Sequence, residues 1–441
     1  MTDLGGVDFN FSFAPGVTDE QVLGFELAGD IWSQFLHDTY KGEDLGINIH
    51  VVVGDNILPD DVAGGAFPAI ETGIHYKKLY RALEDDITTP TDEIAFDSLL
   101  NKNKFDVLIG DNVTNKSFKM QATRANLKAL GMIKEKDFDQ LDGVIVMNSL
   151  VNAESVSWNY NYLEVPQEGE IDFLSVAMHE IGHNLGFVSG VDIYGWNEES
   201  ADFDGKSINH MTPMDLFRYS DESFEQNIND LTFGRAAYFS IDRTAENAIA
   251  MSTGADYQGS HWTNGDSETG MGIMNPTIRF GERWEISEND LTVFDVIGWD
   301  VDYTAEIDLE ALFNNAQISV DNVLAVDRTA DIDDILNTKP YNWAWRSSGA
   351  STGGWWQTGY WSTYESVTEQ VAFVPSSSED NESDSWWNKD SGDNSWWNNL
   401  WWNDSSWDNS WWGSNHSDDN DDSYSWWNWN KDSDDDDNRY S

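Results

Sequence analysis

The segment IDFLSVAMHEIGHNLGF occupies residues 171–187. Its apolar residues recur at intervals of three and four, which predicts an amphipathic helix over this stretch. His179 and His183 are four residues apart, so both imidazoles lie on one face of that helix. Gly186 follows three residues later, where a glycine permits the positive φ of a sharp helix end. The stretch therefore presents two histidines side by side on a helix that stops soon after them.

The residue types on this helix are suited to binding a metal ion. The chain contains no cysteine, so any metal would be bound by His, Asp or Glu. Two imidazoles at this spacing can bind one zinc ion, and Glu180, beside the first, can reach a water molecule on that ion. Glu180 can take the proton of this water and later pass it to a leaving amine. The arrangement favours metal-assisted hydrolysis, although the same short pattern also occurs by chance in ordinary structural helices.

The pattern His179-Glu180-x-x-His183-x-x-Gly186 resembles the metzincin clan of zinc metallopeptidases. In the usual metzincin pattern the third ligand lies three residues after the glycine, and that position here is Ser189, which is not a zinc ligand. The leishmanolysin-like branch of the clan has an insertion before its third histidine, which is followed by a tryptophan and then by a methionine turn. His261-Trp262 and Gly272-Ile273-Met274-Asn275-Pro276 are similar to that layout.

This resemblance covers roughly residues 143–301. It includes Leu291–Trp299, which is similar in layout to the closing helix of the leishmanolysin-like branch. It extends to bacterial secreted relatives that have a HEIGH helix and a GIMNP-type turn. The cysteines typical of leishmanolysins are absent, so we expect no cysteine switch.

The resemblance implies a zinc-dependent endopeptidase that acts on polypeptides in extended form. One catalytic Zn2+ would be bound by His179, His183 and His261, with Glu180 as general base and acid. Met274 would form a hydrophobic floor beneath the metal. A metal-dependent hydrolase of non-peptide amides remains an alternative, because the same residues would serve it.

Two of these assignments have rivals within the chain. His210 is an alternative third ligand, since it also lies downstream of the helix and has methionines nearby. Met271 is the alternative methionine of the turn, three residues before Met274.

The implied fold is α+β, a zincin/metzincin-like two-lobed catalytic domain with a twisted mixed sheet, helices and the zinc helix at the cleft floor. The N-lobe would span about 1–187 and the C-lobe about 188–303. The strand at 144–148 would form the cleft edge that pairs with substrate. The secreted relatives imply an extracellular location, although the N-terminus shows no signal peptide.

Local patterns predict the elements of this α+β domain independently of the resemblance. Thr18-Asp19-Glu20-Gln21 has the form of a capping box that opens a helix reaching about His37. Alternating apolar residues at 47–53 and the apolar run at 143–149 predict strands. Further helices are predicted around 74–84, 94–102, 122–131 and 289–297.

The composition changes beyond the catalytic domain. Residues 304–375 form an extension of uncertain structure, and 376–441 are rich in Trp, Asp, Ser and Asn. The latter segment has 17 acidic and 3 basic residues and few aliphatic ones, so we expect it to be disordered. Its repeated tryptophan pairs suggest a rival function: a surface or matrix binding protein whose zinc site is structural or inactive.

The formal net charge of the chain is −56. Such a charge repels nucleic acid and anionic membranes, and makes either an improbable partner. Calcium is a possible second ion, with the Asp202, Asp204 and Gly205 loop as a candidate site. No apolar run approaches the length of a transmembrane helix, and we favour a monomer.

Overall fold

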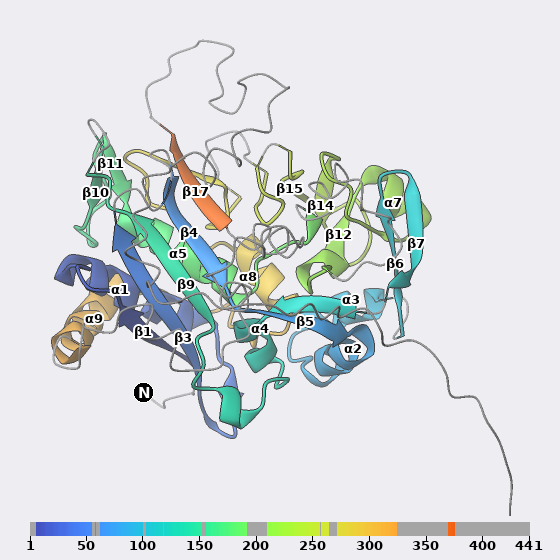
Figure 1. Cartoon of the computed structure of the whole chain (residues 1–441), viewed down its shortest axis with the longest axis horizontal. Helices are drawn as coiled ribbons and strands as arrows, with labels where there is room; N and C mark the ends of the chain where they lie inside the picture. The colour runs from blue at the N-terminus through green and yellow to red at the C-terminus, as the bar shows by residue number, and fades with distance from the viewer. Residues whose placement is uncertain are drawn as a thin grey trace, which may run out of the picture. The chain divides into compact units, whose positions relative to one another are not determined.

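The computed structural model describes residues 6–54, 58, 62–99, 103–117, 119–151, 156–191, 210–255, 257–263, 271–323 and 369–374 (Figure 1). All of these belong to one compact unit, Met1–Ser391, and a second unit comprises Gly392–Ser441. The predicted calcium loop at 202–205 and the tryptophan-rich segment at 376–441 lie outside the described residues.

A mixed sheet dominates the first half of the chain. Its strands β1 (Val7–Phe13), β3 (Glu43–Gly54) and β9 (Gly143–Asn148) are parallel, and β4 (Val62–Pro68) is antiparallel to β9. Every residue of β9 is buried, as expected of a central strand that is mostly apolar. The strands predicted at 47–53 and 143–149 are therefore confirmed.

The prediction that 144–148 forms the edge of a cleft is wrong. β9 lies inside the sheet, where Ile145 pairs with Val51 on β3 and with Ala66 on β4. The next strand outward is β4, whose sequence is VAGGAFP. Two glycines and few β-branched residues give β4 a low strand propensity, so its pattern did not identify it.

Two long helices, α1 (Asp19–Phe35) and α5 (Phe173–Leu185), pack against each other on this sheet. The capping box predicted at the start of α1 is present, with the Thr18 and Gln21 side chains bonded to each other's backbone. Trp32 of α1 donates its indole N–H to the carbonyl of Met178 at 3.0 Å. These contacts fix the position of α5, which carries the HEIGH residues.

The start of α5 is anchored from the second half of the chain. Asp172 is the N-cap and accepts a hydrogen bond from the backbone N–H of Ser175. Arg283 holds the same carboxylate through two hydrogen bonds of 2.9 and 2.7 Å. This charge-assisted fork orients the first turn of the helix.

The other helices lie close to their predicted positions, with shifts at the ends. One predicted helix began at 94, but α3 begins at Pro90 because Thr89 and Asp92 form a capping box there. A helix not predicted, α9, buries Ala316 and Val320 and packs against α1, so ordered structure continues past 303. The helical elements are α2 (Tyr76–Asp85), α3 (Pro90–Ser98), α4 (Arg124–Ala129), η1 (Glu135–Asp137), η2 (Met214–Phe217), α7 (Asp221–Gln226), α8 (Glu288–Val296) and α9 (Leu309–Val323).

Shorter strands complete the fold. They pair as β2 with β3, β5 with β8, β10 with β11, β6 with β7 and β13, and β14 with β12 and β15, while β16 and β17 extend the main sheet beyond β4. Their bounds are β2 (Thr39–Tyr40), β5 (Ile70–His75), β6 (Phe105–Ile109), β7 (Asn112–Ser117), β8 (Lys119–Thr123), β10 (Ser157–Asn159), β11 (Glu170–Asp172), β12 (Arg218–Tyr219), β13 (Asn229–Asp230), β14 (Ala237–Phe239), β15 (Ile249–Met251), β16 (Thr277–Arg279) and β17 (Glu369–Val374).

The fold class is mixed α+β, as predicted. Among the helices that the structure describes, none has the length and apolar character needed to cross a membrane.

Candidate metal centre

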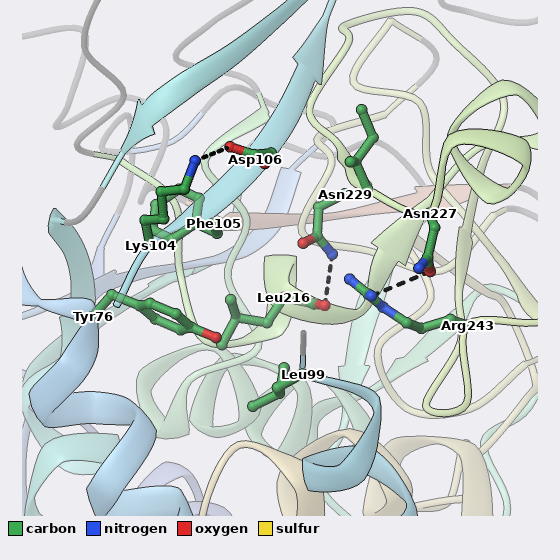
Figure 2. Close-up of a pocket in the computed structure, with 10 residues that line it drawn as sticks. Tyr76, Leu99, Lys104, Phe105, Asp106, Leu216, Asn227, Asn229 and Arg243 are labelled. Carbon is green, nitrogen blue, oxygen red and sulfur yellow. Dashed lines mark hydrogen bonds and ion pairs between the residues drawn. The ribbon is translucent and has the colours of Figure 1, made fainter. Parts of the chain in front are cut away.

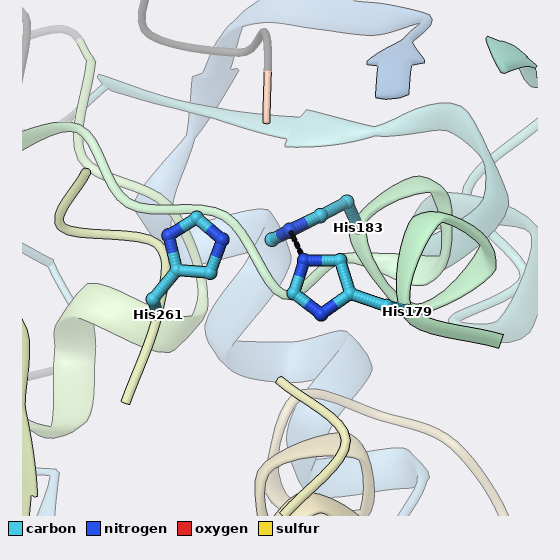
Figure 3. Close-up of side chains that lie close together, drawn as sticks. All are labelled: His179, His183 and His261. Carbon is cyan, nitrogen blue, oxygen red and sulfur yellow. Dashed lines mark hydrogen bonds between the residues drawn. The ribbon is translucent and has the colours of Figure 1, made fainter. Parts of the chain in front are cut away.

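Three buried histidines converge at the middle of α5 (Figure 3). His179 and His183 come from α5, and His261 comes from the loop that follows β15. One ring nitrogen from each lies within 4.8 Å of the others. The three residues are 2%, 0% and 1% exposed. Within the described part of the chain, this is the only group of three or more His, Asp or Glu residues that could hold a metal ion.

The hydrogen bonds of the two helix histidines fix which nitrogen faces the centre. Nδ1 of His179 lies 2.7 Å from the Ile273 carbonyl, and Nδ1 of His183 lies 2.8 Å from the Phe187 carbonyl. A carbonyl oxygen only accepts, so each Nδ1 carries the proton and each Nε2 of the neutral ring presents a lone pair. Burial lowers the pKa of both imidazoles well below the usual value, which favours the neutral form.

The two Nε2 atoms are 2.9 Å apart, the contact dashed in Figure 3. Two lone pairs at that distance repel each other unless a cation lies between them. Imidazoles that face each other through Nε2, with Nδ1–H bonded to backbone carbonyls, have the arrangement of metal ligands and their supporting shell. The donor set of three nitrogens therefore fits zinc.

The third histidine is held by contacts on both sides. Nδ1 of His261 lies 3.2 Å from the Gln258 carbonyl, and the His261 carbonyl accepts from the Ser252 N–H at 3.0 Å. The next residue, Trp262, donates its backbone N–H to the Met274 carbonyl at 3.0 Å. His261 is thus linked to the Gly-Ile-Met-Asn-Pro turn through the residue that follows it.

Ser189, at the position where a shorter spacing would have placed a ligand, has a positioning role instead. Its hydroxyl donates to Asp215 at 2.6 Å, and its backbone N–H donates to the hydroxyl of Ser260 at 2.9 Å. Asp215 also accepts from the N–H groups of Gly190 and Thr212. This buried network ties the chain leaving α5 to the residue before His261. Asp215 was not identified from the sequence, since nothing in its local pattern marks it.

Met274 packs beneath the helix between the two histidines. It is fully buried, and a Cβ added to Gly182 would lie 2.5 Å from its sulfur. Met271, the rival methionine, is half-buried, and its carbonyl accepts from Ser287 and Asn289 of the following segment. The glycine at 182 thus makes room for Met274.

Asp290 of α8 is a second carboxylate that the sequence did not single out. It is fully buried and accepts hydrogen bonds from Trp262 Nε1 at 2.8 Å, the Ile273 N–H at 2.8 Å and the Met274 N–H at 3.3 Å. It therefore orients both the turn and the residue next to the third histidine. The only signal in the sequence was its place in a capping box with Ser287.

Gly186 ends α5 as predicted. Its φ is +131°, and a Cβ there would lie 3.0 Å from Ile297 and 3.2 Å from Asn126. The turn carries the chain to Phe187, whose carbonyl then accepts from His183. Glycine at 186 is therefore required both for the backbone angle and for the close approach.

Glu180 is fully buried on the side of α5 that faces β4. A Cβ added to Gly64 would lie 2.8 Å from Oε1 of this carboxylate. The glycine in β4 leaves room for Glu180 beside the histidines.

His210 is not part of the centre. Its Nδ1 lies 3.3 Å from the Gln121 side-chain oxygen, and burial lowers its pKa to about 4. The group of three includes His261 and excludes His210.

Two pockets differ in their relation to this centre. A small one adjoins His179 and is lined by Val176, Thr277, Ile278 and Trp284 among others. A larger one, between β6 and the segment after α7, contains none of the three histidines (Figure 2). Its polar groups bond to each other, for example Arg243 to Asn227 at 3.2 Å. Of these two pockets, the smaller one is therefore the one that adjoins the candidate metal centre.

Comparison of the chain with protein-family models, with curated proteins and with solved structures found no match.

Proposed function

We propose that this protein is a zinc-dependent endopeptidase whose metal is held by His179, His183 and His261. The observation that carries the proposal is the convergence of three buried imidazoles next to Glu180. When bound, zinc polarises a carbonyl group and lowers the pKa of water. Zinc has no redox chemistry and accepts a nitrogen-only donor set, which suits hydrolysis.

Glu180 acts as general base and then as general acid. It takes a proton from the attacking water and passes it to the amine that leaves when the peptide bond breaks. Glu180 directly follows His179 in the sequence, and its carboxylate lies against Gly64 of β4. Burial of the carboxylate excludes bulk water, which strengthens its interaction with developing positive charge.

The surroundings favour an extended peptide as substrate. β4 runs beside Glu180, and β16 borders the small pocket next to His179 through Thr277 and Ile278. β4 and β16 both pair with β17, and once β17 is displaced their backbone groups can bond to an extended chain, while the pocket offers an apolar space for one side chain. An extracellular site of action, implied by the resemblance, is part of the proposal.

A comparison of wild type with Glu180→Gln tests this function. The amide keeps the size of the side chain but cannot take a proton. We expect both proteins to contain zinc, and only the wild type to cleave casein in a reaction that a chelator stops. Undiminished cleavage by Glu180→Gln would contradict the assigned role.

A further inference from the structure

One strand of the main sheet comes from far along the chain. β17 pairs antiparallel with β4, beside which it is drawn in Figure 1, and parallel with β16, so it lies between these two strands in the sheet. Glu369, Gln370 and Val371 are opposite Ala66, Gly65 and Gly64. The register shifts between Val371 and Ala372, and the strand then pairs with Val62.

This strand passes the candidate centre. Val371 is opposite Gly64, the residue whose added Cβ would lie 2.8 Å from the Glu180 carboxylate. On the other side, Ala372 and Phe373 are opposite Thr277 and Ile278, which line the pocket beside His179. The helix α5 also approaches β17. The backbone of 371–373 therefore runs between the two strands that flank Glu180 and the pocket.

A strand edge can pair with one chain at a time. The backbone groups of β4 that do not bond to β9 are the ones that an extended substrate would need, and β17 pairs with them. Pairing within one chain is intramolecular, which favours it over a substrate free in solution.

We propose that residues 369–374 are a built-in occupant of the substrate edge, which keeps the endopeptidase inhibited until this strand is displaced. The inference rests on the proposed function, since it takes the space between β4 and β16, which β17 fills, as the place where an extended substrate binds. The segment acts by occupying the backbone groups of β4 and β16, so its effect depends on strand pairing.

A double proline variant of the full chain tests the pairing. Successive N–H groups of a strand point to opposite sides, so Val371→Pro with Ala372→Pro removes one donor toward each neighbouring strand. Asn394→Pro with Ser395→Pro is the matched control, because it makes the same change outside β17.

The first readout is hydrogen exchange of the β4 amides. Alternate amides of β4 point to β9, and these report whether the fold is intact in every variant. We expect the β4 amides that point toward β17 to exchange on the order of tenfold faster in the 371/372 variant than in the wild type and the control. Equal exchange of this set in all three proteins would overturn the pairing.

The second readout is casein cleavage at equal zinc content. We expect severalfold faster cleavage by the 371/372 variant, and inhibition of that variant by the free peptide EQVAFV but not by a scrambled peptide. Faster exchange with unchanged cleavage would overturn the inhibition. Faster exchange with no cleavage by any variant would support the pairing and contradict the proposed function. Equal exchange in proteins that all cleave casein would contradict the pairing and support the proposed function.

Discussion

Replacing Gly182 by alanine tests the packing of Met274 under α5. Alanine has the higher helix propensity by about 1 kcal/mol, so the substitution would stabilise α5 if the site were open. Here the new methyl group would lie 2.5 Å from the sulfur and 3.3 Å from the Cε of Met274, and 3.5 Å from Trp32. Both Met274 and Trp32 are fully buried, so neither side chain can move aside into solvent to relieve the overlap.

Overpacking of this kind costs roughly 1–3 kcal/mol, which outweighs the gain in propensity. We expect the midpoint of thermal unfolding to fall by about 2–4 °C for each kcal/mol lost, as measured by circular dichroism. Gly182→Ala should cost less in a Met274→Ala background, where the sulfur is absent, and the double-mutant cycle should give a coupling energy of about 1 kcal/mol or more. An unchanged or raised midpoint in Gly182→Ala, or additive effects of the two substitutions, would refute this packing.

Three further predictions concern the third ligand, its support and the acidic interior. His261→Ala should lower zinc content by metal analysis while His210→Ala leaves it unchanged, and the opposite result would transfer the ligand role. The Asp290 carboxylate accepts from four N–H groups, so Asp290→Asn turns one of its oxygens into a donor that faces donors. This variant should cost about 1–3 kcal/mol in thermal unfolding and lower the zinc content, and a variant that matched the wild type in both would rule out the positioning role. Burial and neighbouring carboxylates raise the pKa of Asp86 to about 8 and that of Asp295 to about 7. Because the folded state then binds more protons than the unfolded state between about pH 4 and 8, stability should fall as pH rises through that window. Asp86→Asn should therefore raise the unfolding midpoint more at pH 8 than at pH 5, and an equal shift at both would contradict the raised pKa.

The elements that the sequence predicted well are those defined by local interactions. The capping box at Thr18, the apolar run of β9 and the spacing of His179 and His183 each act within a few residues. Their signals are therefore complete in a short stretch of sequence, and the structure confirms the capping box, the strand and the helix.

The features that were missed depend on distant contacts. β4 is a strand in spite of Gly64 and Gly65, because it pairs along β9 and leaves room for Glu180. Asp215 and Asp290 gain their importance from donors that lie far away in the sequence, such as the hydroxyl of Ser189 and the indole of Trp262. Long-range pairing also explains why β9 was wrongly predicted to form the cleft edge. The order of strands in a sheet depends on which strands pair, and the sequence of one strand does not show this.

The most direct test of the metal centre is zinc analysis of the purified protein combined with X-ray absorption at the zinc edge. The account predicts one zinc per chain with three imidazole nitrogens at about 2.0–2.1 Å, and two in His261→Ala protein reconstituted with zinc. Absence of zinc after reconstitution, or an imidazole count that His261→Ala leaves unchanged, would contradict it.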